Sequence, residues 1–520
     1  MTSTFAIGLD FGSESARGVL IDIESGEQLL SCTHHYRHGI MTKSLTSGHP
    51  LPEGWALQDA EDYLEATEII LEKLGRDRDI ASIGLGFTAS SPLPASAEGQ
   101  ALSRRYPDEP HAYVKLWKHS AAQHYADSIN LQGGDFLNNF GGKVSGEWLL
   151  AKASQIAYEA PDIWDKTDRF IEAGDWLVWQ LTEREVRSLD FAAYKAQYTD
   201  EAGYPEQVLD GLGSRLGTPY PAGTAAGSVS EKWRQRTGLR GRAIVAVAII
   251  DSHVVLPAVG RMMPHTLVAA LGTSAGYMFL DERGQQLPVG IEGMARDGAL
   301  PGIWCYEAGQ SGFGDILGWF VRHFPRGVDI EESFQLYNQA AEARVPGQNR
   351  LLVLDWWSGN RVPFADTHLS GLIVGLTLNS TSTDIYRALM EALCFGARSI
   401  LDSLREGGLV VEHIFLTSGL SQRNPLLMQM MADVLGYRVS IPDIQNPTAV
   451  GAAIHGVVAA GVVANFDEGS ERFGARKFEY FYPSSASTKA YESLYQNYRE
   501  LMGNEAIHRT MHFLADGSQT

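Results

Sequence analysis

The sequence predicts an α/β protein of two domains, whose mixed sheets flank a central cleft. A chain of 520 residues is too long for one hydrophobic core. Expected helices alternate with expected strands in both halves of the chain, which is the pattern of α/β domains with mixed sheets. A strand–turn–strand segment near the start also recurs in outline halfway along the chain. We therefore expect domains of residues 1–245 and 246–520.

The repeated segment is the most informative part of the sequence. It spans residues 5–22 and again 266–281, and its turn glycines, Gly12 and Gly272, lie 260 positions apart. Each copy reads as an apolar strand, a Gly/Ser/Thr turn and a second strand. Two such turns facing each other would surround a polyphosphate with N–H and hydroxyl donors, with Asp10 placed where Mg²⁺ would sit. Two ordinary hairpins are the alternative, and the duplication favours a nucleotide clamp.

The elements that follow the first copy are predicted from hydrophobic periodicity and turn residues. A hairpin signal, Ser25-Gly26, closes the first copy. In order, the remaining patterns predict a helix at 59–75, a buried strand at 83–87, a loop at 88–94, and a helical, tryptophan-rich stretch at 114–185 with helices near 146–157 and 175–181.

The second half repeats this alternation. A hairpin signal, Arg283-Gly284, closes the second copy. In order, the patterns predict a strand at 243–250, a long helix at 384–406, a strand at 413–417, a loop at 418–424, a helix at 425–435, a strand at 438–441 and a small-residue helix at 448–464.

Composition excludes several classes of protein. A net charge of −20 without a Lys/Arg cluster argues against a nucleic-acid-binding surface. Three widely spaced cysteines without a CxxC pair argue against structural zinc and fit a reducing cytoplasm. The N-terminus shows no signal-peptide pattern. The most apolar stretches, 243–250 and 449–464, are too short or too interrupted to span a membrane.

Three charged residues are candidates for chemistry. Asp251 ends an apolar strand, where a carboxylate would face the ligand crevice of an α/β sheet, although a helix N-cap explains it equally well. Glu307 begins a glycine-rich run, which lets backbone approach a ligand closely. Lys195 interrupts an apolar stretch, and a solvated surface lysine is its first interpretation. No GxxxxGK[ST] or GxGxxG motif offers another phosphate site, which leaves the hairpin clamp.

Several segments then resemble a known family. Residues 8–17 look like the first phosphate segment of the FGGY carbohydrate kinases, and residues 371–376 with 384–391 fit that family's C-terminal signature. The family belongs to the superfamily of actin-like ATPases, which have two ribonuclease H-like domains. Within the family, four further segments resemble those of bacterial L-ribulokinases: 116–119, 141–148, 307–315 and 354–363. The resemblance covers the chain from residue 7 to about residue 498.

The resemblance implies transfer of the γ-phosphoryl group of ATP, with Mg²⁺, to the terminal hydroxyl of a ketopentose, and L-ribulose is the expected sugar. It implies that Asp251 is the general base and that Asp10 acts on the metal. The residues that it assigns to ATP are Gly12, Ser13, Arg17, Gly272, Thr273, Ser274, Gly314, Gly318, Gly419 and Asn424. Those that it assigns to the sugar are Ala89, Lys195, Asp251 and Glu307, which changes the expectation for Lys195 from surface residue to ligand.

One departure from the resemblance affects the choice of sugar. Ribulokinases often carry an aspartate at the position of Gly86. D-ribulose, ribitol and xylulose therefore remain alternative substrates. A non-catalytic sugar or nucleotide sensor and an actin-like filament protein are alternatives on the same fold. The expected partners are a small sugar and ATP, without nucleic acid or membrane, and a homodimer is one option for the assembly.

Overall fold

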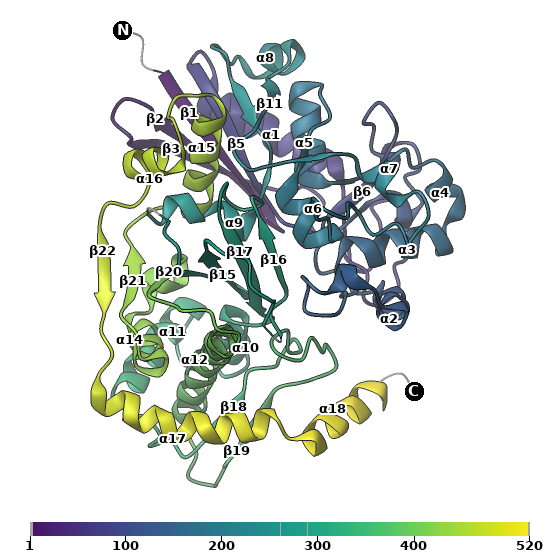
Figure 1. Ribbon diagram of the computed structural model, residues 1–520. Helices are drawn as coiled ribbons and strands as arrows, with labels where there is room; N and C mark the ends of the chain where they lie inside the picture. The colour runs from purple at the N-terminus through teal and green to yellow at the C-terminus, as the bar shows by residue number, and fades with distance from the viewer. Residues whose placement is uncertain (1–3, 261, 289, 518–520) are drawn as a thin grey trace.

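A computed structural model describes residues 4–260, 262–288 and 290–517 (Figure 1). Its first large sheet is built around β1 (Thr4–Phe11), which pairs antiparallel with β2 (Ser15–Asp22) and parallel with β5 (Asp79–Phe87). The full order is β11 (Ala225–Ser228), β12 (Ile244–Ala246), β5, β1, β2 and β3 (Gln28–His35), with β13 (Ile249–Ile250) also paired to β5. The sheet is therefore mixed, as predicted.

The second large sheet repeats this arrangement. Its β14 (Thr266–Leu271) pairs antiparallel with β15 (Ala275–Asp281) and parallel with β20 (His413–Thr417). The full order is β16 (Gly293–Arg296), β17 (Trp304–Gln310), β15, β14, β20, β21 (Val439–Pro442) and β22 (Phe478–Phe481). The predicted α/β fold with two mixed sheets, and the duplication of the strand–turn–strand unit, are confirmed.

The second copy departs from the prediction where it should close a hairpin. After Arg283-Gly284, β15 pairs with β17 rather than with the next strand, β16, which adds to the outer edge of β17. Trp304 opens β17 and lies against Gly284, where an added Cβ would be 2.5 Å from its ring. The place beside β15 is thus taken by β17.

Two other predicted elements differ from the structure. The expected strand 243–250 is split into β12 and β13, because the N–H of Val247 bonds to Thr224 O (3.0 Å) outside the parallel ladder. The expected loop 418–424 contains a short helix, α13 (Gly419–Arg423). Ser418 caps this helix by accepting hydrogen bonds at its Oγ from the N–H groups of Leu420 and Ser421.

Helices cover the sheets. α1 (Ala60–Gly75) is capped by Asp59 and packs beside β2 and β3, while α12 (Ser382–Glu406) begins with a capping box at Thr381. The other helices of the first half are α2 (Gln123–Gln132), α3 (Leu149–Glu159), α4 (Pro161–Asp165), α5 (Ala173–Thr182), α6 (Leu189–Ala196), α7 (Leu212–Leu216) and α8 (Glu231–Thr237). Those of the second half are α9 (Asp251–Val254), α10 (Gly314–His323), α11 (Ile330–Glu342), α14 (Pro425–Leu435), α15 (Pro447–Ala459), α16 (Phe466–Phe473), α17 (Ser485–Met502) and α18 (Glu505–Gly517).

Four short antiparallel or parallel ribbons complete the described strands. They are β4 (Leu57–Gln58) with β7 (Val114–Lys115), β6 (Pro92–Ala95) with β8 (Arg169–Glu172), β9 (Arg187–Ser188) with β10 (Pro219–Tyr220), and β18 (Leu352–Leu354) with β19 (Leu372–Val374).

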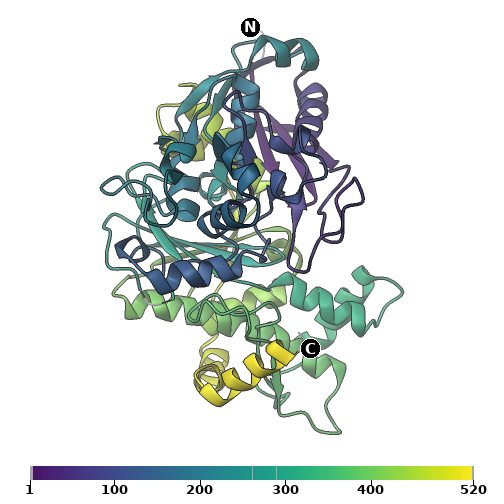
Figure 2. The ribbon, with the colours of Figure 1, turned by 90° about the vertical axis from the view of Figure 1, so that its right-hand side faces the viewer.

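The chain crosses between its two halves more than once. α15 comes late in the sequence, yet it lies beside β1, β2 and β5, and α16 packs against it. α17 and α18 lie at the opposite end of the molecule (Figures 1 and 2). The packing of α15 thus crosses the boundary predicted at 245/246, and that division stays a prediction.

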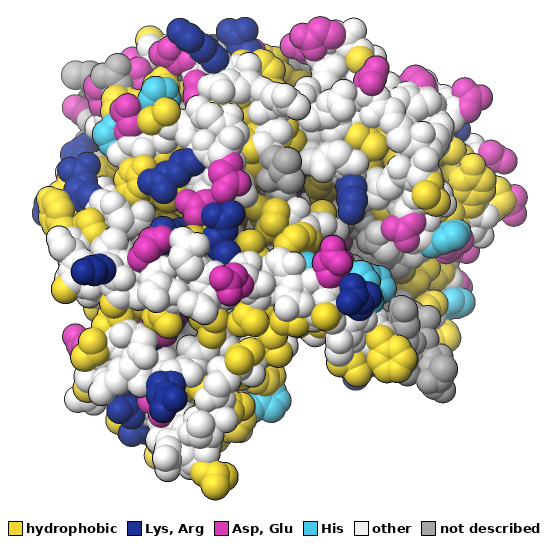
Figure 3. Space-filling model, turned by 60° about the horizontal axis from the view of Figure 1, so that its bottom comes forward, with side chains coloured by type: hydrophobic (Ala, Val, Ile, Leu, Met, Phe, Trp, Pro, Cys, Tyr) yellow, Lys and Arg dark blue, Asp and Glu magenta, His cyan; other side chains and the backbone are white. Residues whose placement is uncertain are grey.

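The surface carries charges of both signs. On the face shown in Figure 3, Lys and Arg side chains are scattered among Asp and Glu side chains and uncharged surface. Within residues 4–260, 262–288 and 290–517, no helix has the length and apolar character needed to cross a membrane.

The contact of α15 with the first sheet depends on glycines. Gly8 and Gly84 are neighbours in the β1–β5 register, and a Cβ at either would lie 1.7 Å from a carbonyl oxygen of α15, that of Ala449 or Ala452. Backbone cannot yield to such a contact as a flexible side chain can. Glycine at both positions therefore lets the helix lie directly on the strands.

We expect Gly84→Ala to lower the free energy of unfolding by about 3 kcal/mol, the upper end of the usual cost of overpacking. Urea denaturation measures this change. Gly503→Ala is the matched control, because its Cβ would find its nearest neighbour 3.5 Å away. Equal stability of the two variants would contradict the inferred contact.

Candidate active site

A cleft of about 1740 Å³ lies between the two large sheets and is lined by residues of both halves. It brings together most of the residues predicted to form the site. Those in the lining are Asp10, Gly12, Ser13, Arg17, Ala89, Lys195, Asp251, Gly272, Thr273, Ser274 and Glu307. Residues that are far apart in the sequence thus share one solvent-accessible space.

The first glycine turn joins β1 to β2 and is held from outside by two side chains. The N–H of Gly12 bonds to Ser15 O (3.0 Å). The indole N–H of Trp117 donates to Ser13 Oγ (2.9 Å), and Gln58 donates to Ser13 O (2.6 Å). These bonds fix the turn, so that its hydroxyl and backbone groups are preorganised at the cleft.

The second turn has a similar form and a different support. The N–H of Gly272 bonds to Ser274 O (2.8 Å). The start of α10 holds the turn from behind, because Gly314 N–H bonds to Gly272 O (3.0 Å) and Phe313 N–H bonds to Thr273 O (2.8 Å). A Cβ at Gly314 would lie 2.7 Å from Gly272 O, so a glycine is needed for this approach.

Four of the predicted nucleotide residues lie outside the lining of the cleft. Gly314 and Gly318 lie on α10, and Gly419 begins α13 next to Ser418, which does line the cleft. Asn424 is buried, and its Oδ1 caps α14 by accepting from Leu427 N–H (3.1 Å). The contribution of these four residues to nucleotide binding stays a prediction.

Asp10 and Asp251 meet at the floor of the cleft. Asp10, the next-to-last residue of β1, pairs with Arg17 of β2 and Gly86 of β5. Asp251 directly follows β13, whose Ile249 also pairs with Gly86. Desolvation and the nearby Asp251 charge raise the pKa of Asp10 to about 7, against the lowering effect of Arg17. The two carboxylates therefore repel each other in a site built to receive positive charge.

Asp251 is a carboxylate poised near neutral pH. Desolvation raises its pKa to about 6, although a hydrogen bond from Ser252 N–H (2.8 Å) and the His253 side chain act in the other direction. Asp251 lines the cleft as the first residue of α9, whereas the N-cap of that short helix is Ile250, so the interpretation of Asp251 as a helix N-cap is wrong. A group with this pKa is ionised at neutral pH and still basic enough to accept a proton.

Helix α6 links Lys195 and Glu307, two residues predicted to bind sugar, to this aspartate. Its Lys195 is buried and places Nζ 2.9 and 3.1 Å from the two carboxylate oxygens of Glu307 on β17. One turn earlier, Asp190 accepts a hydrogen bond from Ile250 N–H (2.9 Å) and pairs with His253 Nδ1 (2.7 Å). The same helix therefore holds the ion pair and the backbone on both sides of Asp251.

The Lys195–Glu307 pair remains charged despite its surroundings. Burial acts to lower the pKa of Lys195, but the Glu307 carboxylate outweighs it and the net pKa is raised. Burial likewise opposes ionisation of Glu307, but Lys195 and His253 hold its pKa below the usual value. The local sequence first predicted that Lys195 is a surface residue. Lys195 is buried, so that prediction is wrong.

Ala89 lies in the loop after β5, and two buried charged side chains support that loop. Lys152 Nζ donates to Ser90 O (2.6 Å), and Glu172 accepts from Ser91 N–H (2.8 Å). Both side chains are buried. The loop that carries Ala89 is therefore fixed at its backbone rather than by its own side chains.

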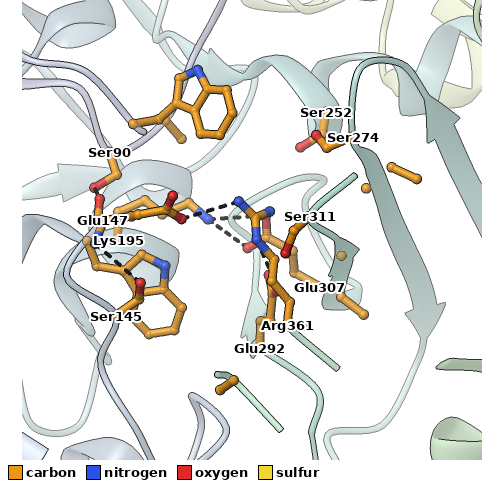
Figure 4. Close-up of a pocket in the computed structure, with 18 of the residues that line it drawn as sticks. Ser90, Ser145, Glu147, Lys195, Ser252, Ser274, Glu292, Glu307, Ser311 and Arg361 are labelled. Carbon is orange, nitrogen blue, oxygen red and sulfur yellow. Dashed lines mark hydrogen bonds and ion pairs between the residues drawn. The ribbon is translucent and has the colours of Figure 1, made fainter. Parts of the chain in front are cut away.

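Sequence reasoning missed a second charged group in the cleft. Arg361 lies 3.3 Å from Glu147 of the first half and 4.0 Å from Glu292 of the second, as Figure 4 shows at its centre. Glu147 and Arg361 fall in the segments that resemble ribulokinases, but no role was assigned to them. Asp190 and His253 were missed because their partners are distant in sequence.

The residues present fit a magnesium ion that is shared with phosphates. Among the residues that the structure describes, no group of three or more His, Cys, Asp or Glu side chains is placed to hold a metal. Mg²⁺ commonly binds through one or two carboxylates together with substrate phosphates and water. Asp10, which lines the cleft beside the first glycine turn, is the carboxylate that fits this role.

Comparisons with known proteins agree with this geometry. Residues 267–460 match the C-terminal domain of the FGGY family of carbohydrate kinases. The chain is 40% identical to a ribulokinase of Halalkalibacterium halodurans, over 96% of this chain and 94% of that protein. It is 38% identical to a ribulokinase of Geobacillus thermodenitrificans over the same shares. In fold it resembles the crystal structure of xylulose kinase from Rhodospirillum rubrum, with a TM-score of 0.82 at 20% identity, over 98% and 100% of the two chains.

The raised pKa of Asp10 predicts a change of stability with pH. The folded protein keeps this proton up to about pH 7, whereas the unfolded chain loses it near the usual value of 3.8. Stability from this group therefore falls as the pH rises between these values. Without metal or nucleotide, we expect Asp10→Asn to have a higher Tm than the natural protein at pH 8, with a difference that shrinks toward pH 4.

Thermal unfolding followed by circular dichroism tests this expectation. Asp210→Asn, at an exposed loop position, is the matched control and should show no such trend. A Tm of Asp10→Asn below that of the natural protein at pH 8 would show that Asp10 is stabilised rather than strained.

Proposed function

Because this chain belongs to the FGGY family of carbohydrate kinases, we propose that it transfers the γ-phosphoryl group of ATP to the terminal hydroxyl of L-ribulose. The observation that carries the proposal is the convergence of Asp251, the two glycine turns and the Lys195–Glu307 pair on one cleft. The names of the relatives, which are ribulokinases over nearly the whole chain, support the choice of sugar.

Asp251 acts as the general base in this proposal. Its carboxylate accepts the proton of the sugar hydroxyl while the hydroxyl oxygen forms a bond to the γ-phosphorus and the bond to the ADP oxygen breaks. Asp190 holds the N–H of Ile250 and the ring of His253, and this fixes the backbone on both sides of the base. A positioned base typically contributes about 10²–10⁴-fold to the rate.

The two glycine turns bind the phosphates from opposite sides of the cleft. The first offers Gly12, Ser13 and the Arg17 guanidinium, and the second offers the N–H and hydroxyl groups of Thr273 and Ser274. Phosphoryl transfer depends mainly on such alignment and charge neutralisation. The adenosine would extend from the second turn past α10 and α13, toward Gly314, Gly318, Gly419 and Asn424.

We assign Asp10 to Mg²⁺. The bound ion would neutralise charge on the β- and γ-phosphates. Asp10 then keeps its carboxylate ionised, since a cation at this position offsets the desolvation and the Asp251 charge that raise its pKa in the free protein. Arg17 of β2, which pairs with Asp10 of β1, already lowers the pKa of Asp10 in the same way.

Lys195, Glu307 and the Ala89 loop form the sugar subsite. Gly86 bears on its selectivity, because a Cβ there would lie 2.8 Å from Val254 Cγ1 and an aspartate would require Val254 to move. This protein therefore lacks one polar contact that the resemblance would supply. D-ribulose or ribitol is the second candidate substrate for this reason, ahead of xylulose.

The three cysteines are free and buried, which suits a reducing compartment, and we propose a cytoplasmic location. A homodimer stays a prediction that sedimentation of the purified chain would decide.

A coupled assay of ADP release tests the proposed function directly. With L-ribulose, D-ribulose, ribitol and D-xylulose offered in turn, we expect the highest kcat/KM with L-ribulose. Asp251→Asn should bind ATP and sugar normally and lower kcat by at least about 100-fold, because it keeps the shape of the base and loses its basicity. A kcat near that of the natural protein would refute the role of Asp251, and no turnover with any pentulose or pentitol would refute the substrate class.

Lys195 gives a separate test of the sugar subsite. Lys195→Met should raise the KM for L-ribulose about tenfold or more and change the KM for ATP much less, because it leaves the Glu307 carboxylate buried without its partner. Lys232→Met, at an exposed position on α8, is the control. An unchanged sugar KM in Lys195→Met would remove Lys195 from the subsite.

A further inference from the structure

Among the charged side chains that line the cleft, five form a group in which carboxyl groups outnumber cations. Glu147, Glu292 and Glu307 carry carboxyl groups, whereas Lys195 and Arg361 are the cations that interact with them. Lys195 bonds both oxygens of Glu307, and Arg361 Nη2 bonds Glu147 (3.3 Å). Each cation thus makes its hydrogen bonds to another carboxylate, and Glu292 has only the longer ion pair with Arg361 (4.0 Å).

Glu292 has an oxygen without a donor. Its Oε1 is buried and makes no hydrogen bond to any residue that the structure describes, and Arg361 Nε stays 4.0 Å away. Buried polar atoms in native proteins nearly always have a partner, so a carboxyl group that lines a cleft and leaves one oxygen without a donor can gain one from a bound ligand. Burial, together with the Glu307 charge and against the effect of Arg361, raises the pKa of Glu292 to about 7.

The backbone around Glu292 directs it toward the same space as Glu307. The N–H of Glu292, which directly precedes β16, bonds to Glu307 O on β17 (2.9 Å), and both residues line the cleft. Gly309 leaves room for the side chains above it, because a Cβ there would lie 3.3 Å from Glu292 Oε1 and 3.2 Å from Arg361 Nη1. Figure 4 shows Glu292, Arg361 and Glu307 grouped on this wall.

We propose that the carboxyl group of Glu292 contacts the sugar, turning so that Oε1 gains a hydrogen bond to a hydroxyl of the ketopentose, and that Arg361 is a positioning residue that orients it. The proposal rests on the proposed function and extends its sugar subsite. A hydroxyl suits this oxygen in either protonation state of Glu292, because a hydroxyl both donates and accepts. Lys195 and Glu307 satisfy much of each other's hydrogen-bonding capacity. These two residues alone therefore leave some hydroxyl groups of a polyhydroxylated ligand without a protein partner.

Arg361 can position Glu292 because it is held from the other half of the chain. It lies in the loop after β18, and its partner Glu147 precedes α3. Its guanidinium therefore reaches between the two walls of the cleft and sets the distance at which Glu292 faces the sugar. Arg361 itself acts through Glu292 rather than on the reacting atoms.

The first experiment compares Glu292→Ala with Glu292→Gln. We expect Glu292→Ala to raise the KM for L-ribulose about tenfold, the effect of losing one hydrogen bond to a buried group, with little change in kcat or in the KM for ATP. Glu292→Gln keeps a side chain that can bond a hydroxyl and should restore most of the affinity. Glu282→Ala, an exposed carboxylate in the same half of the chain, is the control.

Monodeoxy pentuloses identify the contact itself. The analogue that lacks the hydroxyl read by Glu292 should bind the natural protein about tenfold more weakly than L-ribulose, and Glu292→Ala should bind that analogue and L-ribulose equally. Unchanged sugar KM in Glu292→Ala, or equal sensitivity of both proteins to every deoxy analogue, would overturn the contact and assign the free oxygen to bound water.

Two further measurements separate the possible failures. Arg361→Met should raise the sugar KM in the natural background and have no further effect in Glu292→Ala, whereas a merely structural role would lower stability equally in both. Calorimetric titration with L-ribulose alone repeats the comparison without turnover: a Kd about tenfold weaker in Glu292→Ala supports the contact, and an equal Kd overturns it. A protein that binds L-ribulose but releases no ADP would refute the proposed function and leave the contact standing.

Discussion

The Lys195–Glu307 ion pair is the interaction on which the cleft depends. It joins α6 of the first half to β17 of the second, and both groups lie away from bulk solvent. A buried ion pair is weak evidence for added stability, because desolvation offsets most of the attraction. Its effect is geometric. Next to it, Tyr194 O–H bonds to Cys305 O (2.5 Å). Two successive residues of α6 therefore fix the position of the first half of the chain relative to β17.

The same helix carries that constraint to the reacting groups. Asp190 precedes Lys195 on α6 and holds both the end of β13 and His253, so that a shift of α6 would move the ion pair and Asp251 together. His253 Nε2 also lies 3.8 Å from Glu307 Oε1. Lys195, His253 and Asp251 thus form one connected unit. A change in any of these side chains is expected to have effects that do not add to those of its neighbours.

Local sequence patterns predicted the elements that depend on local interactions. β20 has the expected bounds because an apolar run defines it. α14 has them because Pro425 begins the helix and Gly436 ends it. The strand split at Val247 could not be predicted, since its cause is a hydrogen bond to Thr224. The order of β15, β16 and β17 was likewise hidden, because every alternative strand pairing satisfies the same apolar pattern.

The candidate site divides in the same way. The two turns were predicted because their chemistry lies in consecutive residues. The burial of Lys195 was not evident from its neighbours, because the carboxylate that makes it tolerable lies 112 positions away. The resemblance to a family predicted that Lys195 and Glu307 share one site, but it assigned no role to Arg361 or Glu292. Only the distances of these residues to one another, and the lack of a donor at Glu292, show that they form part of the cleft.

Asp10, Asp251 and Glu292 each have a raised pKa, so the free protein holds carboxyl groups at a cost that substrates and metal would relieve. Such a site is least favourable when empty, because a ligand that brings positive charge lowers the cost of ionising these carboxyl groups.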